Sequence, residues 1–293
     1  MIVDVHTHTP YGRHAAPAGR PPARPDRADS GAVSPDEFLR AMEPVDRVIV
    51  FGIAPLPPGD PAAPAVPQEA SAPTARDGNE ATAALVRTKP DKLIGFMSVH
   101  PRDPHLFEEI DRSVGDLGLR GIKLGPNYQN FDPLGADAFR LYRRAQELRL
   151  PILFHQGTSA MAAADLDYAH PRHMDRVATA FPDLKIVLAH MAHPWQVDCI
   201  AVIRKHPNVW ADISGLHYRA WSYYNCLRLA AEWSVLPKLL FGSDYPAAAS
   251  PAETADALTR VNDILDGTRL PRVPVDELQE ILHRNSLSLL GLA

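Results

Sequence analysis

Short apolar runs recur along this chain, and stretches with helical spacing separate most of them. Apolar side chains return every three or four positions in these stretches, as at Phe107, Ile110, Val114 and Leu117, which is the period of an amphipathic helix. Strands that alternate with helices indicate βαβ units and a parallel sheet. Eight such units favour a closed (β/α)8 TIM barrel over an open doubly wound sheet. The eight expected strands are Ile2–His6, Arg47–Ile53, Leu93–Val99, Gly121–Leu124, Pro151–His155, Lys185–His190, Val209–Ile213 and Leu239–Gly242.

Capping residues in front of proline predict where some of the helices begin. Asp103-Pro104 and Ser250-Pro251 each place a capping side chain before proline at the first helical position. Asp132-Pro133 is assigned to the loop ahead of its helix, and a final helix is expected over Val275–Leu292. Residues 1–293 are therefore expected to form a single domain.

Proline is concentrated in two segments, Pro10–Pro35 and Pro55–Pro73, which hold many of the 29 prolines. Both are rich in Ala, Gly and Arg and lack an apolar period, as expected of long and locally stiff loops. Because each follows an expected strand, we predict that both are insertions at the catalytic mouth of the barrel. Surface insertions without a role are the alternative.

The composition is that of a globular protein, with 45% apolar and 22% charged residues among 293. A net charge of −5 provides no basic surface for nucleic acid or for an anionic membrane. No secretory signal and no membrane-spanning apolar run is recognised. Cys199 and Cys226 are isolated, so reduced thiols and a cytoplasmic location are expected. Self-association into a homo-oligomer is left open.

The first eight residues suggest a metal site. His6 and His8 come at the end of the β-branched run of Ile2, Val3 and Val5. Side chains at positions i and i+2 of a strand point to the same side, so both imidazoles can reach one point. Neutral imidazole is the commonest metal ligand in proteins.

Other chemically active side chains also follow strands. Lys123, His155, His190 and Asp244 occur at or near the ends of the fourth, fifth, sixth and eighth runs, where barrel enzymes place their catalytic groups. Imidazoles together with a carboxylate suit Zn²⁺, Mn²⁺ or Fe²⁺. No Gly-x-Gly-x-x-Gly follows a strand, which argues against a dinucleotide fold.

These motifs, in this order, resemble the amidohydrolase superfamily, and within it the amidohydrolase-related branch of metal-dependent hydrolases and decarboxylases. The resemblance covers nearly the whole chain. It is carried by Asp4-Val-His6-Thr-His8, Gly121-Ile-Lys-Leu-Gly-Pro-Asn-Tyr-Gln129, the strand ends at His155 and His190, Gly242-Ser-Asp244-Tyr-Pro246, and the segment from Asn285 to Leu292.

The resemblance implies a barrel that holds one or two divalent metal ions, with zinc expected first and manganese or iron as alternatives. His6, His8, His155 and Asp244 would then bind metal, with His190 beside them. In relatives with two metals the strand-4 lysine can be carboxylated and bridge the ions, a role that Lys123 could take. Burial would favour the neutral amine that carboxylation requires. The alternative is an unmodified lysine that pairs with a substrate carboxylate or with Asp244.

Several further residues on the same rim are candidates for contact with a small-molecule substrate. They are Tyr128, His193, Trp195, His217 and Arg219. A helix-capping or packing role competes for His193, and a solvated position competes for Arg219. Arginine would suit a substrate carboxylate.

Hydrolysis is the expected reaction, on a small amide, lactam, lactone or related C–N or C–O bond. Asp244 would accept the proton of the attacking water, and His190 or a metal would stabilise the oxyanion. The alternatives are non-oxidative decarboxylation of an unsaturated or aromatic acid, and a metalloprotein without catalytic activity. Lys123 favours the hydrolase, and the complete set of ligands argues against an inactive protein.

Overall fold

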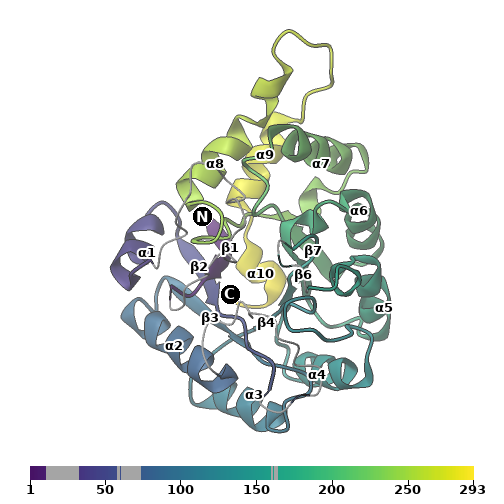
Figure 1. Ribbon diagram of the computed structural model, residues 1–293. Helices are drawn as coiled ribbons and strands as arrows, with labels where there is room; N and C mark the ends of the chain where they lie inside the picture. Colours follow the sequence, from purple (N-terminus) through teal and green to yellow (C-terminus); the bar gives the residue numbers. More distant parts are fainter. Residues whose placement is uncertain (11–32, 58–59, 61–73, 160, 162–163) are drawn as a thin grey trace.

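A computed structural model describes residues 1–10, 33–57, 60, 74–159, 161 and 164–293. Eight parallel strands in the order β1 to β8 form a nearly closed (β/α)8 barrel, and helices α1 to α9 surround it (Figure 1). The strands are β1 (Val3–His8), β2 (Arg47–Phe51), β3 (Leu93–Ser98), β4 (Ile122–Leu124), β5 (Ile152–Phe154), β6 (Ile186–Leu188), β7 (Val209–Asp212) and β8 (Leu239–Leu240).

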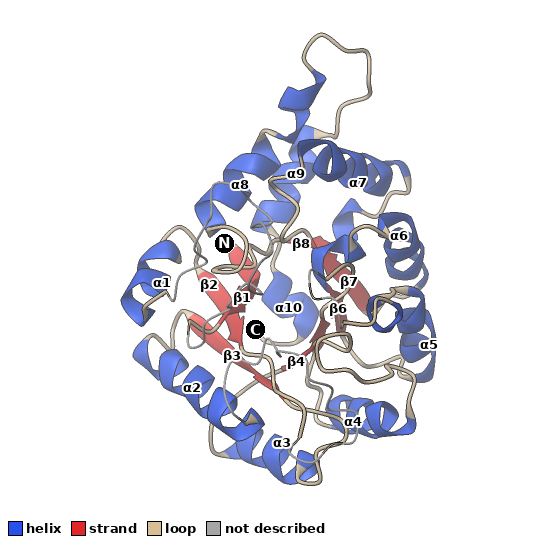
Figure 2. Cartoon of the chain, in the orientation of Figure 1, coloured by secondary structure: helices blue, strands red, loops and turns tan. Residues whose placement is uncertain are grey.

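Helices follow the strands in regular alternation, as Figure 2 shows. They are α1 (Pro35–Ala41), α2 (Ala75–Thr88), α3 (Leu106–Gly115), α4 (Ala136–Glu147), α5 (Arg172–Ala180), α6 (Gln196–Lys205), α7 (Ala220–Glu232), α8 (Pro251–Thr259), α9 (Val275–His283) and α10 (Ser286–Leu290), with short 3₁₀ turns at Asp167–Ala169, Ala189–Ala192, Leu236–Lys238 and Val261–Leu265. Among the described residues no helix has the length and apolar character needed to cross a membrane.

The barrel closes where β8 meets β1. The amide of Val5 donates to the carbonyl of Phe241 (3.0 Å), and the amide of His8 donates to that of Tyr245 (2.7 Å). Thr7 and Tyr245 form a parallel bridge. The segment that directly follows β8 therefore lies beside the histidines of β1.

Strand β1 contains an irregularity in its pairing with β2. Asp4 pairs with Val48 and Thr7 pairs with Val50, so three steps along β1 match two along β2. This one-residue excess is a β-bulge, which breaks the strict alternation of side chains.

The bulge lets two successive side chains of β1 face the barrel interior. Val5 is fully buried in the interior apolar cluster together with Phe51. The next residue, His6, also lies against the Phe51 ring (centroids 5.2 Å apart), and so does His8 (5.0 Å). The strand thus contributes first to the apolar core and then to the polar mouth.

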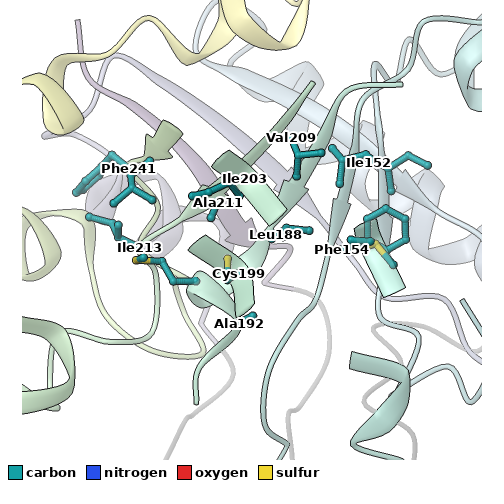
Figure 3. Close-up of a cluster of buried hydrophobic side chains, with 14 of the residues drawn as sticks. Ile152, Phe154, Leu188, Ala192, Cys199, Ile203, Val209, Ala211, Ile213 and Phe241 are labelled. Atoms are coloured by element: carbon teal, nitrogen blue, oxygen red, sulfur yellow. The ribbon is translucent and has the colours of Figure 1, made fainter. Parts of the chain in front are cut away.

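Two apolar cores hold the fold together. One lies between strands and helices, and Figure 3 shows part of it around β5 to β8 and α6. The other lies inside the barrel and includes Leu287, Leu290 and Leu292 of the C-terminal segment, so α10 packs across the barrel (Figure 1). Burial of such side chains contributes roughly 1.5–3 kcal/mol each.

Several boundaries differ from the sequence expectations. The segment expected as one helix over Val275–Leu292 is two helices, because Arg284 is extended (ψ 133°) and the Asn285 side chain caps the second helix. Asp103-Pro104 does not start a helix, since α3 begins at Leu106. The Ser250 cap is confirmed.

The two Pro-rich segments fall only partly within the described residues. Pro35 begins helix α1 behind a Ser34 capping box instead of ending a loop. Most of Pro10–Pro35 and Pro55–Pro73 lies outside the described residues, so their place at the catalytic mouth stays a prediction.

Candidate metal centre

Strand β1 and the segment after β8 bring three of the expected ligands together. Oδ1 of Asp244 lies 3.0 Å from Nε2 of His8 and 3.2 Å from Nε2 of His6. The backbone of Asp244 has a positive φ of 63°, and its amide donates to the carbonyl of His6 (2.8 Å). Ligand atoms of these three residues lie within 4.8 Å of one another.

Lys123 lies in β4, fully buried next to this cluster. Its Nζ is 3.3 Å from Nε2 of His6 and 4.6 Å from the centre of the Phe51 ring. Burial lowers the pKa of Lys123 to about 8, although Asp244 and Asp212 act in the other direction. A substantial neutral fraction is therefore present at mildly alkaline pH.

His155 and His190 complete the polar mouth. The ring of His190 lies 4.9 Å from that of His6, and the ring of His155 lies 5.0 Å from that of His190 (centroid distances). Burial lowers the pKa of His190 to about 4 and that of His155 well below its usual range. Both imidazoles are therefore neutral near pH 7, as metal ligands must be.

His190 occupies a left-handed turn after β6. His190, Met191 and Ala192 have φ values of 58°, 45° and 53°, a conformation that costs roughly 1–2 kcal/mol per non-glycine residue. Strain of this kind persists where surrounding contacts fix it, and it is concentrated at functional sites.

Asp212, at the end of β7, is a site residue that the sequence reading missed. Its Oδ2 accepts a hydrogen bond from Nδ1 of His6 (2.8 Å), and both side chains are fully buried. Burial acts to raise the pKa of Asp212, but the contact with His6 outweighs it and keeps the carboxyl ionised. The strand position of Asp212 was the available signal, since an acid at a strand end belongs to the same pattern as the four residues identified.

The donor set fits a divalent cation. Nδ1 of His6 donates to Asp212, so in neutral His6 the Nε2 atom carries a lone pair that faces the acceptor Oδ1 of Asp244 at 3.2 Å. Two facing acceptors require a proton or a cation between them. In addition, Nε2 of His155 is buried and has no hydrogen-bond partner within the described part of the chain. A metal ion would satisfy both features.

When no cation is bound, a proton on His6 satisfies the same contact. Burial and the nearby Lys123 act against protonation, but the carboxylates of Asp212 and Asp244 hold the pKa of His6 above its ordinary value. His8 differs, because burial lowers its pKa to about 3. The pKa of His6 is therefore raised and that of His8 lowered, although both residues belong to β1.

Asp4 supports the first strand from behind. Its Oδ1 accepts hydrogen bonds from the amides of His6 and Ser243, both 3.1 Å long. This carboxyl ties the backbone of β1 to the segment that carries Asp244.

The expected substrate contacts are more dispersed. The Tyr128 ring lies 4.4 Å from that of His155, and the His193 imidazole is hydrogen-bonded to Gln196 in the first turn of α6. The Trp195 ring lies on that of His170, 4.7 Å away. Of these three residues, Tyr128 is the one whose ring contacts a histidine of the polar mouth.

His217 and Arg219 lie in the segment between β7 and α7. The ring of His217 lies 5.1 Å from that of Tyr218, and the guanidinium of Arg219 lies 4.3 Å from the centre of the same ring. Arg219 also donates to the carbonyl of Gly215 (3.2 Å), beside His190. Both remain candidates for contact with substrate.

Known proteins that are similar to this chain share its fold. A family model described as amidohydrolase matches residues 3–292. A TIM-barrel protein from Bordetella bronchiseptica has a TM-score of 0.69 at 22% identity and covers 99% of this chain and 98% of that one. A protein described as a probable 2-pyrone-4,6-dicarboxylic acid hydrolase, from Acinetobacter baumannii, has a TM-score of 0.63 at 15% identity, with 99% of both chains covered.

Other similar structures are decarboxylases and a hydratase. A dihydroxybenzoic acid decarboxylase from Polaromonas, with bound manganese and the inhibitor 2-nitroresorcinol, has a TM-score of 0.67 at 15% identity and covers 99% of this chain and 97% of that one. Further matches are 5-carboxyvanillate decarboxylases and a 4-oxalomesaconate hydratase. At these identities the likeness shows the fold, and the fold hosts more than one reaction.

Proposed function

The chain belongs to the amidohydrolase family, and we propose that it is a metal-dependent hydrolase of a small amide, lactam, lactone or related C–N or C–O bond. The observation that carries the proposal is the meeting of His6, His8 and Asp244 around one point beside Lys123. His6, His8, His155 and Asp244 would hold the metal. Bound there, a divalent ion would supply Lewis acidity and lower the pKa of water from 15.7 to about 7.

Asp244 is the proposed general base. Hydrogen bonds from His6 and the charge of that residue outweigh burial and hold the pKa of Asp244 well below its usual range, so the carboxyl is ionised at neutral pH, as a general base must be. Its Oδ1 faces the two histidines, whereas Oδ2 has no hydrogen bond from a described residue and lies 3.7 Å from where a Cβ on Gly215 would be. We assign Oδ2 to accept the proton of the attacking water and return it to the leaving group.

Zinc is the proposed metal because nitrogen and carboxylate ligands in a small cluster suit it. Manganese is the alternative, supported by the manganese in the Polaromonas decarboxylase. Lys123 is proposed to bridge a second ion in carboxylated form, since it is buried beside the cluster and its lowered pKa favours the neutral amine. Mass spectrometry of the intact metal-loaded protein tests this, with a mass increase equal to one CO₂ expected and a loss of that increase in Lys123→Met.

Decarboxylation is the second candidate, favoured by the reactions of several structural relatives. It requires a residue that protonates the carbon from which CO₂ departs. Neither Asp244, with its strongly lowered pKa, nor His190, with a pKa of about 4, holds a transferable proton near neutral pH. Lys123, with a pKa of about 8, does hold a proton there, so decarboxylation would require Lys123 as the proton donor.

Turnover in ¹⁸O-water tests the proposed class. A panel of cyclic amides, lactones and hydroxybenzoates would be incubated with the metal-loaded protein, and the products would be analysed by mass spectrometry. Hydrolysis places ¹⁸O in the product acid. Unlabelled product released together with an equal amount of CO₂ would refute hydrolysis and establish decarboxylation.

A further inference from the structure

Asp212 is the acceptor of four hydrogen bonds, all from groups at the carboxyl end of the barrel. Its Oδ2 accepts from Nδ1 of His6 (2.8 Å). Its Oδ1 accepts from the amide of His190 (2.9 Å), and from the amide (3.0 Å) and hydroxyl (2.5 Å) of Ser214. With four donors directed at it, the carboxylate is ionised and acts as acceptor alone.

The proton on His6 can be placed from this geometry. An ionised carboxylate cannot donate, so the hydrogen between Asp212 and His6 is on Nδ1 of the imidazole. Neutral His6 therefore has its lone pair on Nε2, the atom that faces Asp244 and Lys123.

The position of the proton on His190 can be deduced from the contacts of Ser214. The hydroxyl hydrogen of Ser214 is committed to Asp212, so its Oγ, 2.8 Å from Nδ1 of His190, can only accept. The carbonyl of Ser214 also lies 3.2 Å from the same nitrogen and is an acceptor. Both contacts require hydrogen on Nδ1, which leaves the lone pair of neutral His190 on Nε2.

We propose that Asp212 is a positioning residue that fixes one tautomer in both histidines, directly in His6 and through Ser214 in His190. The effect of Asp212 on catalysis rests on the proposed function, whereas the assignment of the two tautomers does not. The assignment makes Nε2 of His190 a hydrogen-bond acceptor or a metal ligand. Because Nε2 of His190 then carries no hydrogen, it cannot donate the hydrogen bond by which His190 would stabilise an oxyanion.

The same carboxylate also supports the backbone that carries His190. The amide of His190, which belongs to the left-handed turn, donates to Asp212 at 2.9 Å. A single side chain therefore fixes the ring proton of His6 and, directly or through Ser214, the ring proton and the strained backbone of His190.

Replacement of Asp212 by asparagine tests the proposal with little change in shape. The amide oxygen can still accept from His190 and Ser214, but the amide NH₂ then replaces Oδ2 opposite His6. Nδ1 of His6 would have to accept, so its proton would move to Nε2 and occupy the lone pair that a cation needs. We expect Asp212→Asn to weaken Zn²⁺ binding by about 10–100-fold, which is the typical loss when a group that orients a metal ligand is removed.

Histidine-labelled protein provides a readout that does not depend on activity. Long-range ¹H–¹⁵N spectra of the Zn²⁺-loaded wild-type protein, assigned with His6→Gln and His190→Gln, should show hydrogen on Nδ1 of both residues. Asp212→Asn should move the hydrogen of His6 to Nε2. As the matched control, Asp175→Asn removes a carboxylate 2.7 Å from Nε2 of His206 outside the site, and it should leave the His6 and His190 signals and Zn²⁺ affinity unchanged.

The outcomes separate this inference from the proposed reaction. Hydrogen on Nε2 of either histidine in the wild-type protein would overturn it, and this measurement stands even where Asp212→Asn does not fold. Unchanged tautomers and Zn²⁺ affinity in a folded Asp212→Asn would overturn it as well. Release of CO₂ in the ¹⁸O experiment would change the reaction class and leave the tautomers as assigned.

Discussion

Nε2 of His8 and Oδ1 of Asp244 lie 3.0 Å apart, although 236 positions separate them in the chain. They meet because β8 and the segment after it close the barrel against β1. The candidate metal centre therefore forms only when the first and last βα units are both in place, so its assembly reports on closure of the whole barrel.

Removal of a ligand from β1 should remove the metal. We expect His6→Ala and His8→Ala each to lose bound metal and all measurable activity, because each supplies one of the three ligand atoms that meet at Asp244. Elemental analysis after dialysis measures the metal directly. His105→Ala is the control, since His105 is exposed and pairs with Glu108 away from the site, and full metal content in His6→Ala would contradict the assignment.

Asp244→Asn should affect turnover more than substrate binding. The amide cannot accept the proton of the attacking water, a function worth about 10²–10⁴-fold, and it is a weaker ligand for the cation. We expect kcat to fall by at least that factor with KM changed much less. Steady-state kinetics at saturating metal would measure this, and a kcat within tenfold of wild type would exclude Asp244 as the base.

Gly215→Ala should inactivate the site through steric contact. A Cβ at this residue would lie 3.1 Å from Nδ1 of His190 and 3.7 Å from Oδ2 of Asp244. Its φ of +67° also adds strain of roughly 1–2 kcal/mol. We expect a lower melting temperature together with a loss of most activity.

Gly118→Ala separates these two effects. Gly118 has nearly the same φ, +69°, but no atom lies within 4 Å of its Cβ position. It should show the same loss of stability with wild-type kinetics. Equal activity in the two variants would mean that the space next to Gly215 has no role in catalysis.

Glu109 should stabilise the protein at neutral pH and lose that contribution in acid. It accepts two hydrogen bonds from Arg112 (both 2.9 Å) and one from Asn79 (2.8 Å). Burial alone would raise the pKa of Glu109, but these contacts lower it. A carboxyl with a lowered folded-state pKa stabilises above its ordinary pKa, and the contribution disappears as the pH falls through the folded-state value.

We therefore expect Glu109→Gln to reduce the free energy of unfolding by about 1–3 kcal/mol at pH 7. The difference from wild type should shrink as the pH approaches 3. Urea denaturation over this pH range would measure it. Glu108→Gln, which changes an exposed neighbour (side chain 81% accessible), should show neither effect, and a pH-independent difference for Glu109→Gln would argue against the ionised pair.

Much of the architecture could be predicted from residue patterns. The eight strands were located because apolar runs with β-branched residues have a different period from helices, and the His-x-His motif marked the end of β1. The break between α9 and α10 was not predicted, although Asn285 is a favourable helix-capping residue, because the apolar period continues through this segment and α10 packs across the barrel.

The site was predictable in its ligands but not in the groups that orient them. His6, His8 and Asp244 follow strands that end at the same rim, so their approach follows from the fold. Asp212 and Ser214 escaped notice because their role depends on distances to His6 and His190, which the register of β7 and the left-handed turn determine. For Asp212 the only signal was its position at the end of β7, and for Ser214 there was none.

The extra residue in β1 decides which side of the strand His6 and His8 face. If β1 kept all its residues but lost the bulge, Val3 and Val5 would still face the interior cluster, and regular alternation would turn both imidazoles toward the helix layer. The strand would still pair in the barrel, but the two metal-binding side chains would no longer reach the barrel mouth. Folding and catalysis are thus encoded in the same few residues but are separable by a shift of a single position.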